Sequence, residues 1–130
     1  GYNSNILAAN NGTVITANGN CNNHGSSCNG RRGNYVVIKH NVGNYYTVYM
    51  HLNRIMVSVG ENVSTGQVIA TMGNTGYVVP TPSSYNPYGG THLHFGVMVG
   101  SSNGTPVNPL NFYWWKFVFC LLVVKEILLI

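Results

Sequence analysis

Two histidines separated by a single residue, His92 and His94, are the strongest candidates for chemistry in this sequence. In an extended strand, residues i and i+2 project from the same face, so both imidazoles point the same way. Leu93, Phe95 and Val97 then face the opposite side, where an apolar core is expected. Such a pair suits metal binding or acid–base chemistry. It also suits two exposed histidines on a solvated sheet face, because the H-x-H pattern is short and common.

His51 is the third candidate, and it belongs to a different β-rich segment, residues 45–52. Alternation divides this segment into two faces, with Tyr46, Val48, Met50 and Leu52 on one and Thr47, Tyr49 and His51 on the other. We therefore expect His51 on a polar face, with Tyr49 beside it as a candidate groove residue. Neighbouring positions for segments 45–52 and 91–99 in one sheet would bring three imidazoles to a single groove. His40 and His24 are expected to be surface and loop residues.

The segments that must position these histidines are short β-rich runs separated by turn residues. They cover residues 13–17, 35–40, 45–52, 67–72 and 91–99. The Gly/Asn-containing link 41–44 predicts a hairpin between two of these runs. A long segment rich in Pro, Ser, Tyr and Gly, residues 77–90, is expected to form one wall of a groove. Together with the abundance of turn formers, the pattern predicts an all-β domain.

Composition excludes several classes of function. The 130 residues fit one domain, and the acidic residues are only Glu61 and Glu126, with no Asp. Paired-carboxylate catalysis needs two acids near one cleft, and a Ser-His-Asp triad needs an Asp, so both are disfavoured. The formal charge of +4 comes from scattered Lys and Arg without a basic stripe, so we expect no nucleic-acid partner.

Cys21 and Cys28 enclose a short loop that contains His24. A disulfide, two free thiols and a metal site with His24 are the alternatives, and the spacing favours the disulfide. Cys120 has no evident partner. No signal peptide is recognisable in the sequence.

Residues 112–130 differ from the rest because they are nearly all apolar. Their number approaches the roughly 20 residues of a membrane span, but Lys116, Lys125 and Glu126 interrupt them. A membrane segment, an element that covers the core and a sequence unrelated to the domain remain the alternatives. We therefore divide the chain into a domain, residues 1–111, and an apolar tail, residues 112–130, through which alone we expect any membrane contact.

Five short motifs follow one another at close spacing, at residues 49–52 (YMHL), 59–63 (VGENV), 66–70 (GQVIA), 73–76 (GNTG) and 92–95 (HLHF). Each is weak alone, but the ordered set resembles the lysostaphin/LytM-type zinc metallopeptidases, metallopeptidase family twenty-three. The resemblance spans approximately residues 6–112.

This resemblance implies a compact, mostly antiparallel β-sheet domain with a narrow groove. It implies a Zn²⁺-dependent endopeptidase that hydrolyses stem peptides or Gly-rich bridges of bacterial peptidoglycan. His94 corresponds to a zinc ligand of the family, and His92 and His51 correspond to its two catalytic histidines. The substrate class, with the Cys21 and Cys28 pair, implies an extracellular or cell-envelope location.

The sequence departs from the family in one respect. The family takes its other zinc ligands from an H-x-x-x-D motif, and this sequence contains no Asp. We expect Gly1 to lie just after that motif, so that this fragment binds zinc poorly and turns over little. The alternative is a catalytically degenerate module that binds cell-wall peptide or a partner without cutting.

Overall fold

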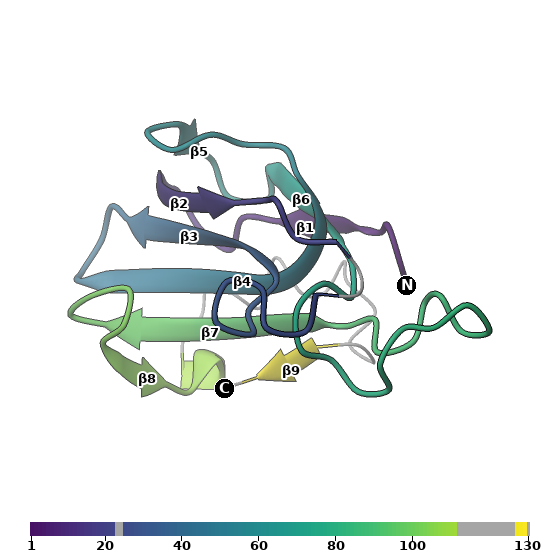
Figure 1. Cartoon of the computed structure of the whole chain (residues 1–130). Helices are drawn as coiled ribbons and strands as arrows, with labels where there is room; N and C mark the ends of the chain where they lie inside the picture. Colours follow the sequence, from purple (N-terminus) through teal and green to yellow (C-terminus); the bar gives the residue numbers. More distant parts are fainter. Residues whose placement is uncertain (23–24, 112–126, 130) are drawn as a thin grey trace.

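The chain folds into a curled, mostly antiparallel β-sheet (Figure 1). The computed structural model describes residues 1–22, 25–111 and 127–129. Within these residues lie nine strands and one 3-10 helix: β1 (Asn5–Leu7), β2 (Gly12–Asn18), β3 (Asn34–His40), β4 (Tyr45–Ile55), β5 (Asn62–Val63), β6 (Val68–Met72), β7 (Leu93–Val99), β8 (Thr105–Val107), η1 (Pro109–Asn111) and β9 (Ile127–Leu129). The predicted all-β fold is confirmed.

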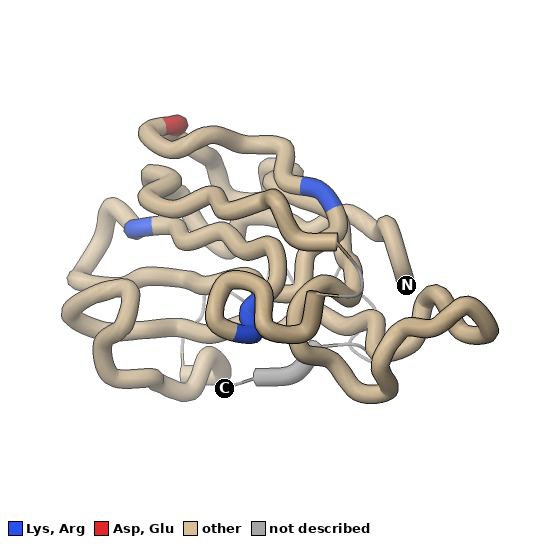
Figure 2. The backbone as a smooth tube through the Cα atoms, viewed as in Figure 1, with Lys and Arg blue, Asp and Glu red and all other residues tan. Residues whose placement is uncertain are grey.

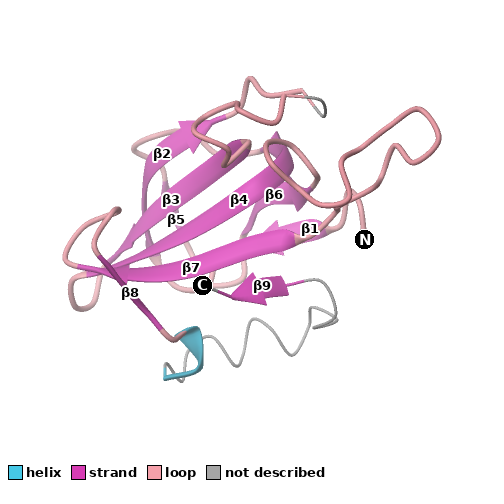
Figure 3. Cartoon of the chain, turned by 60° about the horizontal axis from the view of Figure 1, so that its bottom comes forward, coloured by secondary structure: helices cyan, strands magenta, loops and turns pink. Residues whose placement is uncertain are grey.

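The strand β4 organises the sheet because three other strands pair with it. It forms the predicted hairpin with β3. It also pairs antiparallel with β7 over its first six residues, and with β6 from Leu52 onward. His51 therefore lies where β4 changes from one partner strand to another. Figure 3 shows β7, β4 and β3 side by side in the sheet.

The apolar core lies on one side of this sheet. Leu93, Phe95 and Val97 of β7 are at most 1% exposed, as their alternation with the histidines predicts. Phe95 contacts the ring of Tyr49, with the ring centroids 5.2 Å apart. Further buried residues complete the core: Ile6, Ala8, Ala9, Val14, Val36, Ile38, Leu52, Ile69, Ala70 and Met72.

Residues 77–90 contain no strand and form the long loop that projects from one end of the sheet in Figures 1 and 3. A second loop, between β2 and β3, is closed by a disulfide between Cys21 and Cys28. The expectations for His24, for Cys120 and for most of the 112–130 tail lie outside the described residues. The described part of that tail, β9, pairs parallel to β7. Within the described ranges, no helix is long enough and apolar enough to cross a membrane.

Candidate metal centre and groove

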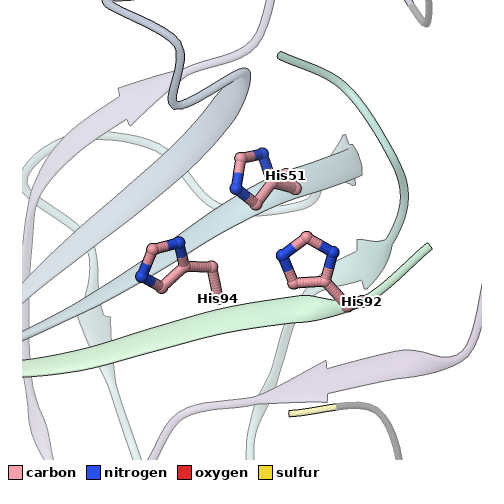
Figure 4. Close-up of side chains that lie close together, drawn as sticks. All are labelled: His51, His92 and His94. Atoms are coloured by element: carbon pink, nitrogen blue, oxygen red, sulfur yellow. The ribbon is translucent and has the colours of Figure 1, made fainter. Parts of the chain in front are cut away.

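The structure brings His51, His92 and His94 together (Figure 4). His51 comes from β4, His94 from β7, and His92 from the residue just before β7. The ring centroid of His51 lies 4.8 Å from that of His92 and 5.6 Å from that of His94. One potential ligand atom from each residue lies within 4.8 Å of the other two. Three imidazoles at this spacing can hold a divalent metal ion.

The position of His51 does not arise from regular strand alternation. Met50 pairs with His94 across the two strands, and Tyr49 pairs with Phe95 in the core. Alternation alone would place His51 on the core side with Tyr49. The backbone of His51 instead has a φ of 60°, in the left-handed region. This left-handed conformation breaks the alternation and directs the imidazole of His51 to the same side as His94.

The expectation that Tyr49 lines the groove is wrong. Tyr49 is fully buried in the core, and its hydroxyl oxygen accepts hydrogen bonds from the Ala9 backbone N–H (2.9 Å) and the Thr47 hydroxyl (3.1 Å). Burial raises the pKa of Tyr49 to about 12. Because Thr47 is also fully buried, the face that the sequence suggests to be polar is the core face, and its polar atoms are paired there.

Neighbouring backbone groups fix His51 from two sides. Its Nδ1 donates to the Thr75 carbonyl oxygen (2.8 Å), and its backbone N–H donates to the Arg32 carbonyl oxygen (3.0 Å). Thr75 is itself held, because its hydroxyl donates to the Leu52 carbonyl (2.7 Å) and accepts from the Asn34 N–H (2.9 Å). Burial lowers the pKa of His51 to about 4 and so keeps the ring neutral.

His92 is oriented in the same manner, by a carbonyl at the other end of the 77–90 loop. Its Nδ1 donates to the Gly90 carbonyl oxygen at 2.7 Å. A carbonyl oxygen only accepts, so the proton of each neutral ring sits on Nδ1 in both His51 and His92, and each Nε2 keeps a lone pair. Burial lowers the pKa of His94, and charge on His92 lowers it further. The lowered pKa values of His51 and His94 favour the neutral form of these two rings, which is the form that binds metals.

The three imidazoles lie in a groove of about 930 Å³. Its other lining residues are Gly1, Tyr2, Tyr77, Val78, Val79, Pro80, Asn86, Tyr88, Gly89, Gly90 and Thr91. Most of them belong to the 77–90 loop, as expected for a groove wall. No lining side chain carries a fixed charge. The groove thus offers apolar and backbone surface to a chain that lies along it.

Asn74 fixes this wall, and its role could not be read from the sequence. It is fully buried, and its Nδ2 donates to the carbonyl oxygens of Pro87 (3.0 Å) and Gly89 (2.9 Å). An Asn before Thr-Gly reads as a turn residue, so spacing alone gave no sign of a clamp.

Two further expectations concern residues outside the groove. His40 is not a surface residue but 4% exposed, with Nε2 2.8 Å from the Thr47 hydroxyl. The Thr47 hydroxyl inside the core provides a polar partner, which explains how His40 can be buried although it lies beside a turn.

Glu61, the acidic residue in the described ranges, is exposed next to β5 and away from the loop 77–90 (Figure 2). No carboxylate of the described residues therefore accompanies the three imidazoles.

Comparison with known proteins agrees with this arrangement. The family model "Peptidase family M23" matches residues 1–109. The peptidoglycan DD-endopeptidase ShyC of Vibrio cholerae is 42% identical over 98 residues, which are 75% of this chain and 19% of ShyC. The chain thus spans about a fifth of the length of this curated relative.

Solved structures agree as well. The catalytic domain of the antimicrobial peptidase lysostaphin from Staphylococcus simulans superposes with a TM-score of 0.64 and 33% identity, covering 86% of this chain and 71% of that domain. A zinc-containing peptidase from Vibrio cholerae superposes with a TM-score of 0.61 and 33% identity, covering 82% of this chain and 26% of that protein. With its ordered motifs, its sheet and its histidine cluster, the chain belongs to peptidase family M23.

Proposed function

We propose that this chain is the catalytic domain of a zinc-dependent endopeptidase that hydrolyses peptide bonds in bacterial peptidoglycan. The observation that carries the proposal is the meeting of His51, His92 and His94, with ligand atoms within 4.8 Å of one another, in an open groove. The names of the relatives support the substrate class, since one is a peptidoglycan DD-endopeptidase and another is lysostaphin. This substrate implies an extracellular or cell-envelope location.

The donor atoms of the cluster fit zinc. Imidazole nitrogen is one of the usual zinc ligands, and the carbonyl contacts of the His51 and His92 Nδ1 atoms orient these two rings beside His94. In this proposal His94 is one ligand of the ion. The family's Asp ligand is missing, because this sequence contains no Asp. The ion would supply Lewis-acid polarisation of the scissile carbonyl.

His92 and His51 then serve proton transfer. Peptide hydrolysis requires a base that takes a proton from the attacking water and an acid or hydrogen-bond donor at the oxyanion or the leaving amine. Both rings present an Nε2 lone pair to the groove side, because a carbonyl fixes each Nδ1 proton. We assign the base to His92 and the second role to His51, whose Nε2 can donate only after it has gained a proton. The groove wall 77–90 would hold the substrate in extended form.

A module that binds cell-wall peptide or a partner without cutting it is the second candidate. The absence of Asp from the sequence favours it, because a catalytic zinc site usually has three protein ligands. The retention of all three histidines favours the enzyme, since binding alone does not require this set.

Metal content and hydrolysis, measured on the same preparations, test the proposal. Release of peptides from purified peptidoglycan by the zinc-loaded chain should be slow, because the sequence lacks the Asp ligand of the family, and a chelator should stop the release. His94→Ala should lose both bound zinc and hydrolysis. His92→Ala should lose hydrolysis while its zinc content stays near that of the wild type.

Three outcomes would argue against these assignments. Hydrolysis that persists in chelator and in His94→Ala would remove the zinc mechanism. Loss of zinc from His92→Ala would show that His92, and not His94 alone, is a metal ligand. Binding to peptidoglycan without any hydrolysis by the zinc-loaded chain would favour the non-cutting module.

A further inference from the structure

The chain after the disulfide loop lies directly against the start of the groove wall. The backbone N–H of Tyr77 donates to the Arg31 carbonyl oxygen at 3.0 Å. The approach at Gly76 is so close that an added Cβ would lie 2.3 Å from the Gly33 nitrogen and 2.6 Å from the Arg31 oxygen. The position of residue 31 relative to the groove is therefore set by backbone contacts.

These contacts seat the Arg31 side chain on a residue that lines the groove. Its guanidinium carbon lies 3.9 Å from the centroid of the Tyr77 ring, within cation–π range. The Arg31 backbone has a φ of 76°, in the left-handed region that residues other than Gly and Asn seldom adopt. Backbone of this kind gathers at binding and catalytic sites, and His51 is a second example in the same structure.

The guanidinium of Arg31 keeps its hydrogen-bonding capacity. Among the described residues, no acceptor takes a hydrogen bond from it and no carboxylate pairs with it. The neighbouring Arg32 differs, because it donates to the Asn103 side-chain oxygen at 3.3 Å. A guanidinium that lies on an aromatic face retains donors at its edge, in a fork that matches a carboxylate.

We propose that Arg31, seated on Tyr77, is a subsite for a carboxylate of the peptide that occupies the groove. The groove lining contains no acidic residue to compete for the guanidinium. The subsite would favour stem-type peptides, which carry free carboxylates, over neutral glycine bridges. This inference rests on the proposed function, because it names the chemistry of the substrate of the same groove.

A positional peptide scan tests the subsite. The ligands are four N-acetylated, C-amidated alanine tetrapeptides, each with Glu at a different position, and four matched peptides with Gln. Their affinities are measured by NMR titration of the chain in chelator, so that no peptide is cut. At low salt we expect at least one Glu peptide to bind about two- to fivefold more tightly than its Gln partner, as for an exposed ion pair. The preference should fade at about 1 M salt.

Two variants assign this preference to Arg31. Arg31→Gln should abolish it and leave the affinity for the Gln peptides unchanged, which a general loss of structure would not do. Arg54→Gln removes an exposed arginine of β4 outside the groove lining and should retain the preference. Arg31→Lys should retain part of it, because charge remains without the forked donors.

Several results would overturn the subsite. They are the absence of a Glu preference at all four positions, a preference that survives in Arg31→Gln, and an equal loss in Arg54→Gln. Hydrolysis of the Gln peptides by the zinc-loaded chain is recorded separately. Hydrolysis without any Glu preference rejects the subsite alone, whereas absence of both binding and hydrolysis for every peptide rejects the proposed function with it.

Discussion

The imidazole of His51 depends on a backbone conformation that costs on the order of 1–3 kcal/mol in a residue other than glycine. Two contacts offset this cost: its N–H bonds to the Arg32 carbonyl, and its Nδ1 bonds to the Thr75 carbonyl. The position of the His51 ring is thus determined by main-chain atoms of Arg32 and Thr75, which do not line the groove.

Thr75→Val tests this support. The substitution keeps the shape of the side chain, but it leaves the buried Asn34 N–H without its partner and removes one of the two side-chain donors to the Leu52 carbonyl. We expect a loss of about 1–3 kcal/mol in the free energy of unfolding, and slower hydrolysis by the folded protein. Urea unfolding and initial rates check both, with Thr75→Ser as a control that retains the hydroxyl. Wild-type stability and rate in the Val variant would contradict the support assigned to Thr75.

Tyr49→Phe separates a core role from a groove role. Removing the hydroxyl leaves the buried Ala9 N–H without an acceptor and the Thr47 hydroxyl with the His40 ring as its remaining partner, so stability should fall by about 1–3 kcal/mol. The rate of hydrolysis per folded molecule should not change, because the hydroxyl does not reach the groove. Thermal unfolding and active-site-normalised rates distinguish the two. A selective loss of rate would restore Tyr49 to the groove.

At this scale the sequence predicts side-chain direction only where the strand is regular. The period of two assigns Leu93 and Phe95 to the core and His94 to the open face. The same rule groups His51 with Tyr49, and a left-handed residue breaks it. A single φ angle leaves no trace in hydrophobic alternation, so the sequence permits the three rings to converge but does not reveal the backbone conformation that directs His51 toward the other two.

Among the elements, β4 supplies His51 at the point where it changes partner strands, and the paired strand β7 supplies His94. The loop that follows β6 runs against the disulfide-closed loop, where Gly33 and Gly76 approach too closely for any side chain. This contact joins the groove wall to the sheet.

Gly76→Ala tests that contact against a matched control. Gly76 and Gly66 have nearly the same φ, 78° and 79°, but an added Cβ meets backbone atoms only at Gly76. Gly66→Ala should cost about 1–2 kcal/mol, the penalty of the left-handed conformation alone. Gly76→Ala should cost more and should slow hydrolysis. Denaturant midpoints and rates for the two variants check this, and equal effects would show that the close approach is unimportant.

The long strands could be predicted from β-branched and aromatic runs between turn residues, as for β3, β4 and β7. Short elements could not, because they exist through pairing. The two-residue β5 is a strand only because Gly12 and Thr13 of β2 lie beside it. Likewise, the clamp at Asn74 arises from a contact with residues 13 and 15 positions away, which no local pattern encodes.

For the whole molecule, a polar chain inside the core links His40, Thr47 and Tyr49. Burial lowers the pKa of His40 below its ordinary value, so the folded state resists protonation of this ring. The unfolded state binds the proton near pH 6.5, and the contribution to stability is therefore complete above about pH 6.5 and decreases as the pH falls.

His40→Gln tests this dependence. Between pH 7.5 and 5.5 the wild type should lose more stability than the variant, although the variant should be less stable at pH 7.5 because it loses the contacts of the ring. His51 and His94 titrate in both proteins, so the difference between the two pH slopes isolates His40. Urea midpoints at the two pH values suffice, and parallel slopes would contradict the prediction.

The global arrangement was only partly accessible from the sequence. A single β domain follows from composition, and the β3–β4 hairpin follows from its short turn. The pairing of β7 with β4, on which the cluster depends, joins residues more than 40 positions apart, and hydrophobic pattern does not specify which strands become neighbours.

Both proton-bearing ring nitrogens, in His51 and in His92, are held by carbonyls that flank the same stretch of chain, at Thr75 and at Gly90. Chimeras that exchange this stretch to admit a different peptide will therefore also change the orientation of the His51 and His92 rings. We expect such chimeras to change turnover and substrate preference together, and to recover turnover only when the spacing of the two flanking carbonyls is preserved.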